Sequence, residues 1–524
     1  MTIVAHVDVL ISGMGPTGAT LAALLGQRGI KVAVFDRLPD LYPLPRAIGL
    51  DHEAMRIVQE LGLADAMAPC LGAYMPSEYL GMDGQLIKRL DTQPEPHPLG
   101  WSPNYVFNQP AFERVIRARL SELDTVKFYT EADVLDSGQD EASAWLDVRL
   151  KGHPQPVRFT AQYVVACDGG ASPIRKRLGI ALEDLGFDEP WLVVDALVPD
   201  ELLARLPQTQ VQYCEAARPA TFVVGSGGHR RWEIMLNPGD SVEAEFPDAE
   251  LWPLLSRWVK PGEVKLMRRA AYRFHGLLAQ AWRQGRTFLA GDAAHMTPPF
   301  MAQGMVQGLR DAHNLAWKLV RVINGESPGQ LLDTYFEERC PHVRQTTRTA
   351  LELGRVICER DPVKARERDT ALRAAQGGEV KTVYRQNMIP GLSAGLIAKG
   401  TNAAGTIFPQ PIIHADQYVG RLDDWVGSRC LVLIHGTLDD SLRARYQASA
   451  QRVGAKVVEL TQRGKLEDHA PHAISETQSL LADWFAQHGA SVAVVRPDHY
   501  VFGTAPSFVE GLALMKQWEQ GVMH

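Results

Sequence analysis

Three glycines near the amino terminus have the G-x-G-x-x-G spacing of a dinucleotide site. Gly13 permits a tight turn, Gly15 lets the backbone approach a pyrophosphate, and Gly18 lets a helix pack closely on the preceding strand. The start of that helix would present free N–H groups and a positive dipole end to the phosphates. Asp36 follows about 20 residues later, where a carboxylate accepts hydrogen bonds from ribose hydroxyls. The spacing therefore predicts dinucleotide binding.

Two acidic turns further along the chain could line the same crevice. Asp168 and Gly169 directly follow an apolar strand. Gly291 and Asp292 follow another, and a helix is expected just beyond them at residues 306–323. An acid at the carboxyl end of a parallel strand points into the crevice where such sheets bind ligands. A purely structural Asp-Gly turn is the alternative for the first pair.

Two polar side chains could reach a dinucleotide bound at this place. Arg46 leaves a loop that contains three prolines and could extend towards the phosphates, with a solvated surface arginine as the alternative. Gln109 follows Asn108, a candidate N-cap for a helix predicted at residues 111–120. An exposed surface amide is the alternative for Gln109.

These residues need a scaffold of alternating strands and helices, and the hydrophobic pattern predicts one. Residues 7–11 and 31–35 read as buried parallel strands on either side of a helix at residues 19–28. Another helix is expected at residues 51–61, with Asp51 as its N-cap. An ordinary glycine-rich turn is the alternative to a dinucleotide site, but the order of strand, helix and acid favours the site.

The sequence changes character between residues 183 and 272, where β-rich or alternating runs replace helical stretches. This pattern predicts a mostly antiparallel β-sheet inserted into the α/β domain. One face of such a sheet could form the wall of a substrate pocket. Solvated edge charges are the alternative for the arginines among the four side chains on or beside it, Arg218, Arg230, Arg231 and Trp232.

The last part of the chain has the order and size of a thioredoxin-like module, with a strand at residues 430–434 and a helix at residues 441–453. It lacks a Cys-x-x-Cys pair, so a packing or assembly role is expected instead of dithiol exchange. The predicted fold class is α/β. The predicted domains are a Rossmann-like dinucleotide-binding domain at 1–182 that resumes with a helical segment at 273–400, the sheet domain at 183–272, and the thioredoxin-like domain at 401–524.

Composition narrows the class of function. The chain has 524 residues, a net charge of −7 and a hydrophobic fraction of 45%, which is ordinary for a globular enzyme. The negative charge argues against a nucleic-acid partner, and no apolar run reaches the length of a membrane span. The six cysteines are scattered, which favours a reduced, cytoplasmic protein with neither a disulfide framework nor a metal site.

Taken together, these motifs resemble those of the flavoprotein aromatic hydroxylases of the para-hydroxybenzoate hydroxylase fold. The glycine motif with Asp36, the Asp168-Gly169 turn and the Gly291-Asp292 turn match the three FAD motifs of that group, in order. Within the group, the chain is most similar to the 3-(3-hydroxyphenyl)propionate (3-hydroxycinnamate) hydroxylase branch. This likeness is carried by segments 166–172, 230–233, 311–319, 484–488 and 496–498.

The resemblance implies tightly bound FAD. Its pyrophosphate would lie at the glycine motif, its adenosine ribose at Asp36, and a ribityl hydroxyl at Asp292. Asp168 would lie near the adenosine half, and Val306 stands where the branch usually has asparagine. The residues expected to bind FAD are Gly13, Gly15, Pro16, Thr17, Gly18, Asp36, Arg37, Arg46, Gln109, Asp168, Gly169, Gly291, Asp292, Gly304 and Met305.

The resemblance also implies a reaction. A monooxygenase of this kind would take electrons from transiently docked NADH or NADPH, and its reduced flavin would capture O₂ as a C4a-hydroperoxide. That species would hydroxylate a phenolic ring ortho to an existing hydroxyl, for example 3-(3-hydroxyphenyl)propionate in aromatic catabolism. The alternatives are another phenolic or heteroaromatic substrate, an FAD-dependent reductase, and a non-catalytic flavin-binding protein.

The reaction centre can be predicted in outline. Pro298 would lie over the reactive face of the flavin. His295 and Tyr272 are candidates for the base that deprotonates the phenol, with core packing as the alternative for each. A propionate group on the substrate should meet a cation, for which Arg218 is the candidate, with Trp232 as a second substrate contact. Apart from a small aromatic substrate, a second copy of the chain is the one partner we consider.

Overall fold

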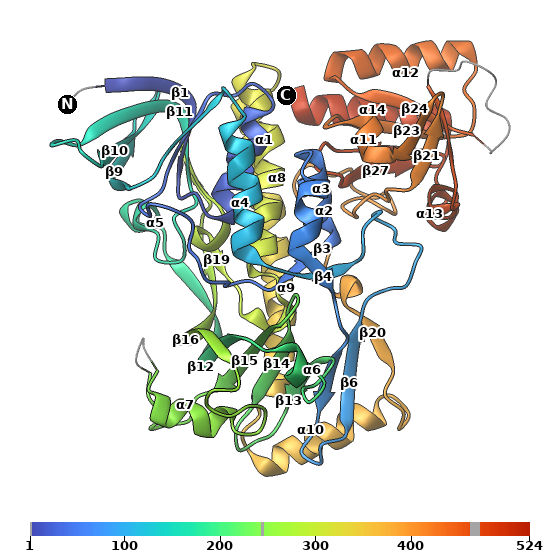
Figure 1. Cartoon of the computed structure of the whole chain (residues 1–524). Helices are drawn as coiled ribbons and strands as arrows, with labels where there is room; N and C mark the ends of the chain where they lie inside the picture. Colours follow the sequence, from blue (N-terminus) through green and yellow to red (C-terminus); the bar gives the residue numbers. More distant parts are fainter. Residues whose placement is uncertain (1–2, 243–245, 462–471, 524) are drawn as a thin grey trace.

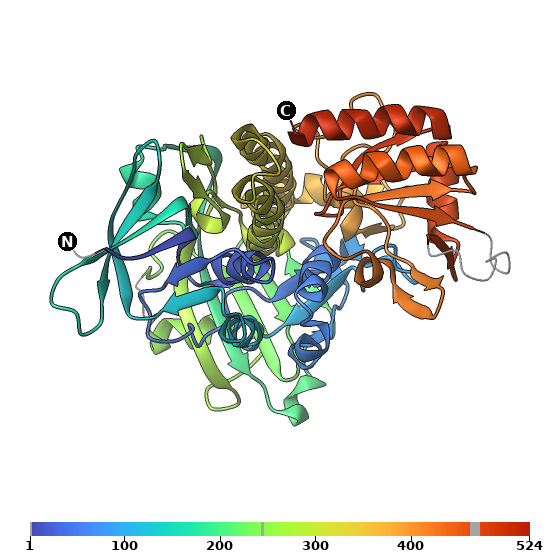
Figure 2. The same ribbon diagram turned by 90° about the horizontal axis from the view of Figure 1, so that it is seen from above.

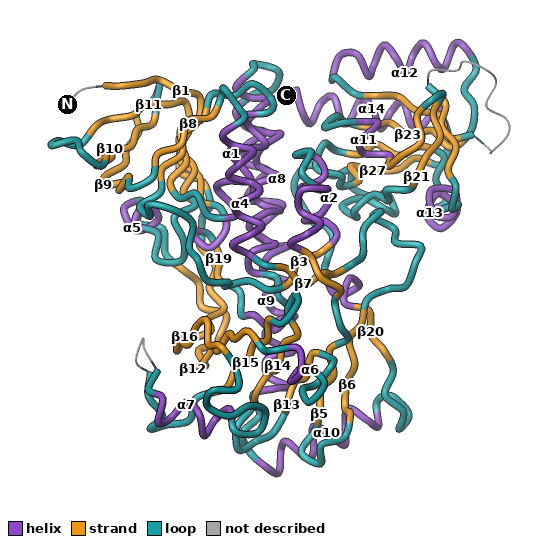
Figure 3. The backbone as a smooth tube through the Cα atoms, in the orientation of Figure 1, coloured by secondary structure: helices purple, strands orange, loops and turns teal. Residues whose placement is uncertain are grey.

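The computed structural model describes residues 3–242, 246–461 and 472–523. Three main β-sheets form separate layers, with helices packed between and around them (Figures 1 and 3). In the described ranges, no helix combines the length and the apolar character needed to cross a membrane. The predicted α/β fold class is confirmed.

The first sheet is the parallel scaffold of the dinucleotide-binding domain. Neighbouring strands β8, β2, β1, β11 and β18 all run parallel. Val9, Leu10 and Ile11 of β1 are completely buried, as a central strand covered on both faces requires. The strands of this sheet are β1 (Ile3–Ser12), β2 (Val32–Phe35), β8 (Val126–Tyr129), β9 (Ala132–Gln139), β10 (Ala144–Leu150), β11 (Val157–Ala166), β17 (Arg283–Gln284) and β18 (Thr287–Leu289).

Helix α1 starts at Pro16, earlier than predicted, because proline suits the first turn of a helix. It packs against α4 and α8 (Figure 1). The predicted N-caps are confirmed, since Asp51 accepts a hydrogen bond from Ala54 N and Asn108 accepts one from Ala111 N, both at 3.0 Å. The helices around this sheet are α1 (Pro16–Gly26), α2 (His52–Glu60), α3 (Ala64–Met67), α4 (Gln109–Ser121), α5 (Pro173–Arg177), α8 (Gly304–Ile323) and α9 (Thr334–Ile357).

The second sheet contains the predicted antiparallel insertion and extends beyond it. Strand β13 pairs in parallel with β5, so residues that precede the insertion complete the sheet. Its order is β19 (His295–Met296), β16 (Lys265–Ala279), β12 (Leu182–Leu197), β15 (His229–Met235), β14 (Ala220–Val224), β13 (Gln210–Tyr213), β5 (Ser77–Leu80), β6 (Leu86–Asp91) and β20 (Thr382–Tyr384). Segments around it form α6 (Asp200–Leu203), α7 (Asp248–Leu255) and α10 (Pro362–Ala374), and a small sheet joins β3 (Gly49–Asp51), β7 (Asn104–Phe107) and β4 (Leu71–Ala73).

The third sheet has the thioredoxin-like connectivity that the sequence predicts. Its central strands β23 and β24 are parallel, whereas β26 and β27 pair antiparallel on the other side. Figure 2 shows this module beside the helical layer of the first domain. Its elements are β21 (Ile412–Ala415), β22 (Tyr418–Arg421), α11 (Leu422–Val426), β23 (Leu431–His435), α12 (Asp440–Val453), β24 (Lys456–Leu460), β25 (Ala473–Glu476), α13 (Leu480–His488), β26 (Val492–Val495), β27 (Val501–Ala505) and α14 (Phe508–Met523).

Candidate functional site

The parallel register brings the three predicted turns to one edge of the first sheet. Ser12 at the end of β1 pairs with Ala166 at the end of β11, and Ala166 pairs with Leu289 at the end of β18. The glycine motif, the Asp168 turn and the Gly291 turn therefore leave adjacent strands at the same carboxyl edge. Open α/β sheets bind ligands at this edge.

A pocket opens at this edge and reaches across to the second sheet. It holds about 1550 Å³ of space outside the protein atoms, including its open mouth. Residues that follow strands of the first sheet and residues of the second sheet line it, and a concave site between two packed layers is a usual place for a small-molecule ligand. Among the residues predicted to bind FAD, those that line it are Gly15, Pro16, Thr17, Arg46, Gln109, Gly169, Asp292, Gly304 and Met305.

The three glycines of the first motif divide into two kinds. Gly13 has a φ of +97°, and a Cβ there would lie 2.2 Å from the carbonyl oxygen of Cys167. A Cβ on Gly18 would lie 2.0 Å from the carbonyl oxygen of Gly13. At Gly15, by contrast, nothing lies within 4 Å of the Cβ position, which faces the pocket. Gly13 and Gly18 therefore shape the turn, and Gly15 leaves space for a ligand.

Several predicted cofactor contacts lie outside the pocket wall, namely Gly13, Gly18, Asp36, Arg37, Asp168 and Gly291. Asp36 braces the glycine motif, because its carboxylate accepts hydrogen bonds from Met14 N at 2.8 Å and from Leu38 N at 2.9 Å. Asp168 Oδ1 is buried and has no hydrogen-bond partner among the described residues. Burial raises the pKa of Asp168.

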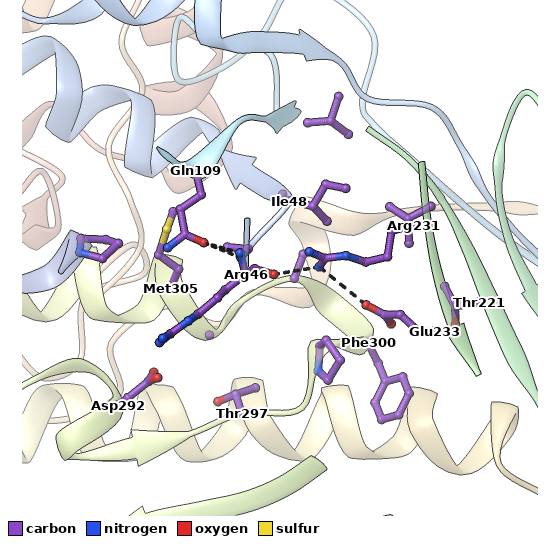
Figure 4. A pocket seen from close by; sticks show the side chains of 18 of the residues that line it. Arg46, Ile48, Gln109, Thr221, Arg231, Glu233, Asp292, Thr297, Phe300 and Met305 are labelled. Carbon is purple, nitrogen blue, oxygen red and sulfur yellow. Dashed lines mark hydrogen bonds and ion pairs between the residues drawn. The ribbon is translucent and has the colours of Figure 1, made fainter. Parts of the chain in front are cut away.

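The end of the pocket next to the glycine motif is called the dinucleotide end. Arg46 and Asp292 are its charged side chains. The Arg46 guanidinium reaches towards Asp292 (Figure 4) and makes no hydrogen bond within the described chain. Gln109 Oε1 fixes the loop below it by accepting from Arg46 N at 3.0 Å and Ala47 N at 2.6 Å. Burial raises the pKa of Asp292, and attraction to His295 and Arg46 opposes this rise. An unpaired guanidinium beside the free N-terminus of α1 is a favourable place for phosphate.

The proposal of His295 as the base does not fit its position. His295 is buried outside the pocket, and its Nε2 lies 2.6 Å from Asp311 Oδ2. Asp311 also accepts from Gly291 N at 3.0 Å and Arg339 Nε at 2.9 Å. Burial raises the pKa of Asp311, but His295 and Arg339 outweigh it and bring the pKa to about 2. His295 thus helps to hold the Asp311 carboxylate, which positions the turn before Asp292.

The alternation of strand β15 explains which of its side chains face the pocket. Trp232 is completely buried in the core of the second sheet, so Arg231 and Glu233 point to the opposite face and line the pocket. Sequence reasoning assigned Trp232 to the substrate. This assignment does not fit the structure, because the Trp232 side chain is buried in the core. Side chains alternate between the two faces of a strand. Once Trp232 is recognised as a core residue, this alternation identifies Glu233 as a residue of the pocket face.

Arg231 is a clamp between the two sheets. It bonds Asp195 through Nε at 2.7 Å, and it donates to the carbonyl oxygens of Arg46 at 2.7 Å and Pro45 at 3.0 Å. Arg268 donates to Pro45 O as well, at 2.7 Å. The loop that carries Arg46 is therefore held from the second sheet by buried, charge-assisted hydrogen bonds.

The opposite end of the pocket, called the sheet end, is lined by strands of the second sheet. The rest of its wall is polar and carries few charges. Tyr74 bonds Ser77 at 2.6 Å, and Arg385 donates to Tyr74 Oη at 2.9 Å and to Met301 O at 2.7 Å. Phe300 supplies an apolar surface on the same side (Figure 4). Gln210, Gln212, Thr221 and Val223 complete this part of the wall.

Three other predicted contacts also lie away from the pocket. Tyr272 is 37% exposed and stacks with Arg268, and Arg218 pairs with Asp240 at 2.5 Å. Pro298 is buried behind the wall that Pro299 lines. Five described residues were assigned to catalysis or substrate binding, and this pocket is lined by none of them: His295, Tyr272, Pro298, Arg218 and Trp232.

One cluster of candidate metal ligands occurs in the described ranges. Ligand atoms of Glu60, His313 and His499 lie within 4.8 Å of one another. The Glu60 carboxylate already pairs with Arg28 and accepts from Ser428 at 2.6 Å. These contacts account for the cluster as part of the packing between the first domain and the thioredoxin-like module.

The chain matches two family models. The model described as the FAD binding domain covers residues 6–350, and the HcaD C-terminal domain covers residues 405–513. The first match spans the glycine motif, both acidic turns and the inserted sheet. The site fits FAD. Gly15 leaves open space, the helix N-terminus and Arg46 supply donors, and the Asp292 carboxylate supplies an acceptor.

Two curated relatives cover nearly the whole chain. A probable NADH-specific resorcinol 4-hydroxylase from Rhodococcus jostii is 39% identical over 98% of this chain and 94% of the relative. A 3-(3-hydroxy-phenyl)propionate/3-hydroxycinnamic acid hydroxylase from Burkholderia cenocepacia is 32% identical over 94% of this chain and 93% of the relative.

Solved structures show the same fold over almost the full length. The flavin-dependent monooxygenase PieE has a TM-score of 0.82 at 19% identity, with 99% of each chain covered. Aklavinone-11 hydroxylase has a TM-score of 0.80 at 20% identity and covers 99% of this chain and 100% of its own. From the family model, the relatives and the site, the chain belongs to the FAD-dependent aromatic hydroxylases, which are monooxygenases.

Proposed function

We propose that this enzyme uses NADH to hydroxylate a small phenol at the ring carbon ortho to an existing hydroxyl group. The observation that carries the proposal is one continuous pocket with two different ends. One end has the glycine motif, Arg46 and Asp292, and the other has a polar wall from the second sheet. A cofactor and an aromatic ring can therefore meet between them.

Residues at the dinucleotide end would hold the cofactor. The N-terminus of α1 and the Arg46 guanidinium would take its diphosphate, and Asp292 would accept from its sugar chain. The backbone at Gly304 and Met305 would lie against the ring system. Bound flavin would supply the electron transfer and oxygen chemistry, while the protein orients the ring and limits water.

A resorcinol-type ring is the first substrate candidate. The relative at 39% identity carries a resorcinol hydroxylase name, whereas relatives with a phenylpropionate name are 30% to 32% identical. Position 4 of resorcinol lies next to a ring hydroxyl, which agrees with ortho hydroxylation. Neutral polar groups on the wall, such as Ser77, Gln212 and Thr221, suit a ring that carries hydroxyls.

A phenylpropionate is the second candidate, and a single residue favours it. Arg385 lines the pocket, and its hydrogen bonds go to the neutral Tyr74 hydroxyl and the Met301 carbonyl. Its charge is therefore not neutralised by a carboxylate in those bonds. A substrate carboxylate could pair with it, in the role that sequence reasoning gave to Arg218.

The test is a substrate panel with purified holoenzyme. Resorcinol, phenol and 3-(3-hydroxyphenyl)propionate would each be added with NADH under ¹⁸O₂, and products identified by mass spectrometry. We expect substrate-stimulated NADH oxidation and one labelled oxygen in an ortho-dihydroxy product. NADH oxidation without label in any product would support the reductase alternative and overturn the proposal.

Arg385→Met separates the two substrates. If the substrate carries a carboxylate, KM should rise at least tenfold for the propionate and change little for resorcinol, because only the former loses an ion pair. Arg218→Met serves as the matched control, since its guanidinium pairs with Asp240 outside the pocket.

A further inference from the structure

Within the described chain, the pocket is lined by two carboxylates, Asp292 and Glu233. Asp292 lies at the dinucleotide end. Glu233 comes from the middle of β15, where its backbone pairs with Thr221 of β14 and Val193 of β12. It therefore projects from a central strand of the second sheet, which is a rigid position for a functional group.

The Glu233 carboxylate forms an ion pair with Arg231 and accepts no hydrogen bond from the described residues, and it faces the pocket although only 6% of the residue is exposed. Its closest cation is Arg231, with Nη1 3.8 Å from Glu233 Oε1. That distance is beyond a hydrogen bond, and the guanidinium already binds Asp195 and the carbonyl of Arg46. Figure 4 shows the carboxylate between Arg231 and Phe300, directed into the pocket.

A carboxylate that faces a pocket and has no hydrogen bond from the protein can accept one from a ligand. In a pocket for a phenol, the donor that fits is the substrate hydroxyl. Tyr74 is the other acid–base group at this end, but its hydroxyl is already shared with Ser77 and Arg385. His295, one of the two bases that sequence reasoning considered, is bound to Asp311 outside the pocket.

We propose that Glu233 is the catalytic group that accepts the phenol proton. This proposal rests on the proposed function. The phenol O–H bond breaks, the proton forms an O–H bond with a Glu233 carboxylate oxygen, and the electron pair stays on the phenolate. The added electron density makes the ortho ring carbon a better nucleophile. The proton returns to solvent after the product leaves, which restores the carboxylate.

The surroundings of Glu233 suit this task. Burial raises its pKa, and the nearby charge of Asp195 raises it further, while Arg231 and Arg268 oppose the rise. A base whose pKa is moved upward towards neutral pH is better matched to a phenol than an ordinary carboxylate. The two guanidinium groups also place positive charge near the position where the phenolate forms.

The experiment compares Glu233→Gln with the wild-type holoenzyme and with Glu189→Gln. Glu189 is a partly buried carboxylate on β12 of the same sheet, burial also raises its pKa, and it lies outside the pocket wall. Substrates are the best phenol of the panel and its ring-fluorinated analogues of increasing acidity. Bound FAD is measured from the visible spectrum, and product formation is measured across pH.

We expect Glu233→Gln to keep its FAD and to bind the phenol, but to form product about 10²–10⁴-fold more slowly. The loss should shrink to a few-fold for analogues that are already ionised at the assay pH, because they need no base. Wild-type activity should rise with pH as the carboxylate loses its proton, and the variant should lack this rise. Glu189→Gln should behave as wild type.

Three results would overturn the assignment of Glu233. The first is a Glu233→Gln variant with wild-type rate and pH profile, and the second is a loss of rate that is equal for weakly and strongly acidic phenols. The third is a Tyr74→Phe variant that shows the whole effect expected of Glu233→Gln. All three leave the proposed hydroxylase function intact, whereas a wild-type enzyme that hydroxylates none of the phenols would overturn that function and the role of Glu233 together.

Discussion

The two ends of the pocket are built in different ways. The dinucleotide end is made mainly of backbone, since Gly15, Gly304 and the start of α1 leave space and expose N–H groups. The sheet end is made of side chains from β13, β14 and β15 and from β5, which lies far from these three strands in the chain. Backbone sites leave a local spacing in the sequence, whereas side-chain sites depend on which strands become neighbours.

The largest expected effect separates two glycines of the same motif. Gly13→Val should cost about 3–5 kcal/mol of folding free energy, because φ is positive and the new side chain would meet Cys167 O. Gly15→Ala should leave the stability of the apoprotein within about 0.5 kcal/mol but weaken FAD binding at least tenfold. Thermal unfolding of the apoprotein and FAD titration measure the two effects. Equal destabilisation by both changes would contradict this division.

The next effect tests whether the sheet end supports the dinucleotide end. Arg231→Met should destabilise the protein by about 3–5 kcal/mol, because buried Asp195 loses its arginine hydrogen bonds, keeping the one to His229, and the Arg46 loop is freed. FAD should dissociate more readily as well. Urea denaturation and FAD retention on dilution check this.

Arg230→Met is the matched control for that prediction. Arg230 lies on the opposite face of β15, and among the described residues it donates to the carbonyls of Gly227 and His229. Its loss should cost about 1–2 kcal/mol and leave FAD retention unchanged. If both variants lost FAD equally, the link between the two ends of the pocket would be refuted.

A smaller effect is expected where the thioredoxin-like module meets the first domain. Tyr500 donates to Glu53 at 3.0 Å, and Glu53 pairs with Arg310 of α8. Tyr500→Phe should cost about 1.5–3 kcal/mol, because a buried carboxylate loses a donor. Tyr418→Phe, which loses a bond to Arg421 O within the same module, should cost about 1 kcal/mol or less. Melting temperatures of the two holoenzymes give the comparison.

The smallest effect concerns a residue that sequence reasoning assigned to the substrate. Arg218→Met breaks a partly exposed ion pair with Asp240, so stability should change by about 0–1 kcal/mol. KM for the best phenol should stay within about twofold of the wild-type value. A tenfold rise in KM would return Arg218 to the substrate site and extend the sheet end beyond the pocket described here.

The sequence predicted the parallel sheet, the N-caps at Asp51 and Asn108, and the convergence of the acidic turns, because each depends on local pattern. It did not predict that β5 joins the second sheet, since pairing between distant edges leaves no local signal. The role of Glu233 was missed for a related reason. The position of Glu233 in the pocket follows only once Trp232 is known to be buried, because neighbouring residues of a strand point to opposite faces.

Val306 shows the same limit at the level of one residue. The resemblance placed it where the branch usually has asparagine, but its side chain, in the first turn of α8, is completely buried in the core. Ala302, two residues before Gly304, instead adopts a φ of +52° and lines the pocket. The backbone of this loop, and not the side chain at position 306, therefore faces the ligand.

Cys167 lies in the wall of the pocket, directly before the Asp168 turn. Burial and the neighbouring Asp168 and Asp311 raise the pKa of this thiol well above its usual value. A thiol reacts with peroxides mainly as the thiolate. The raised pKa therefore keeps this sulfur as the protonated thiol, the form that reacts slowly with oxidants.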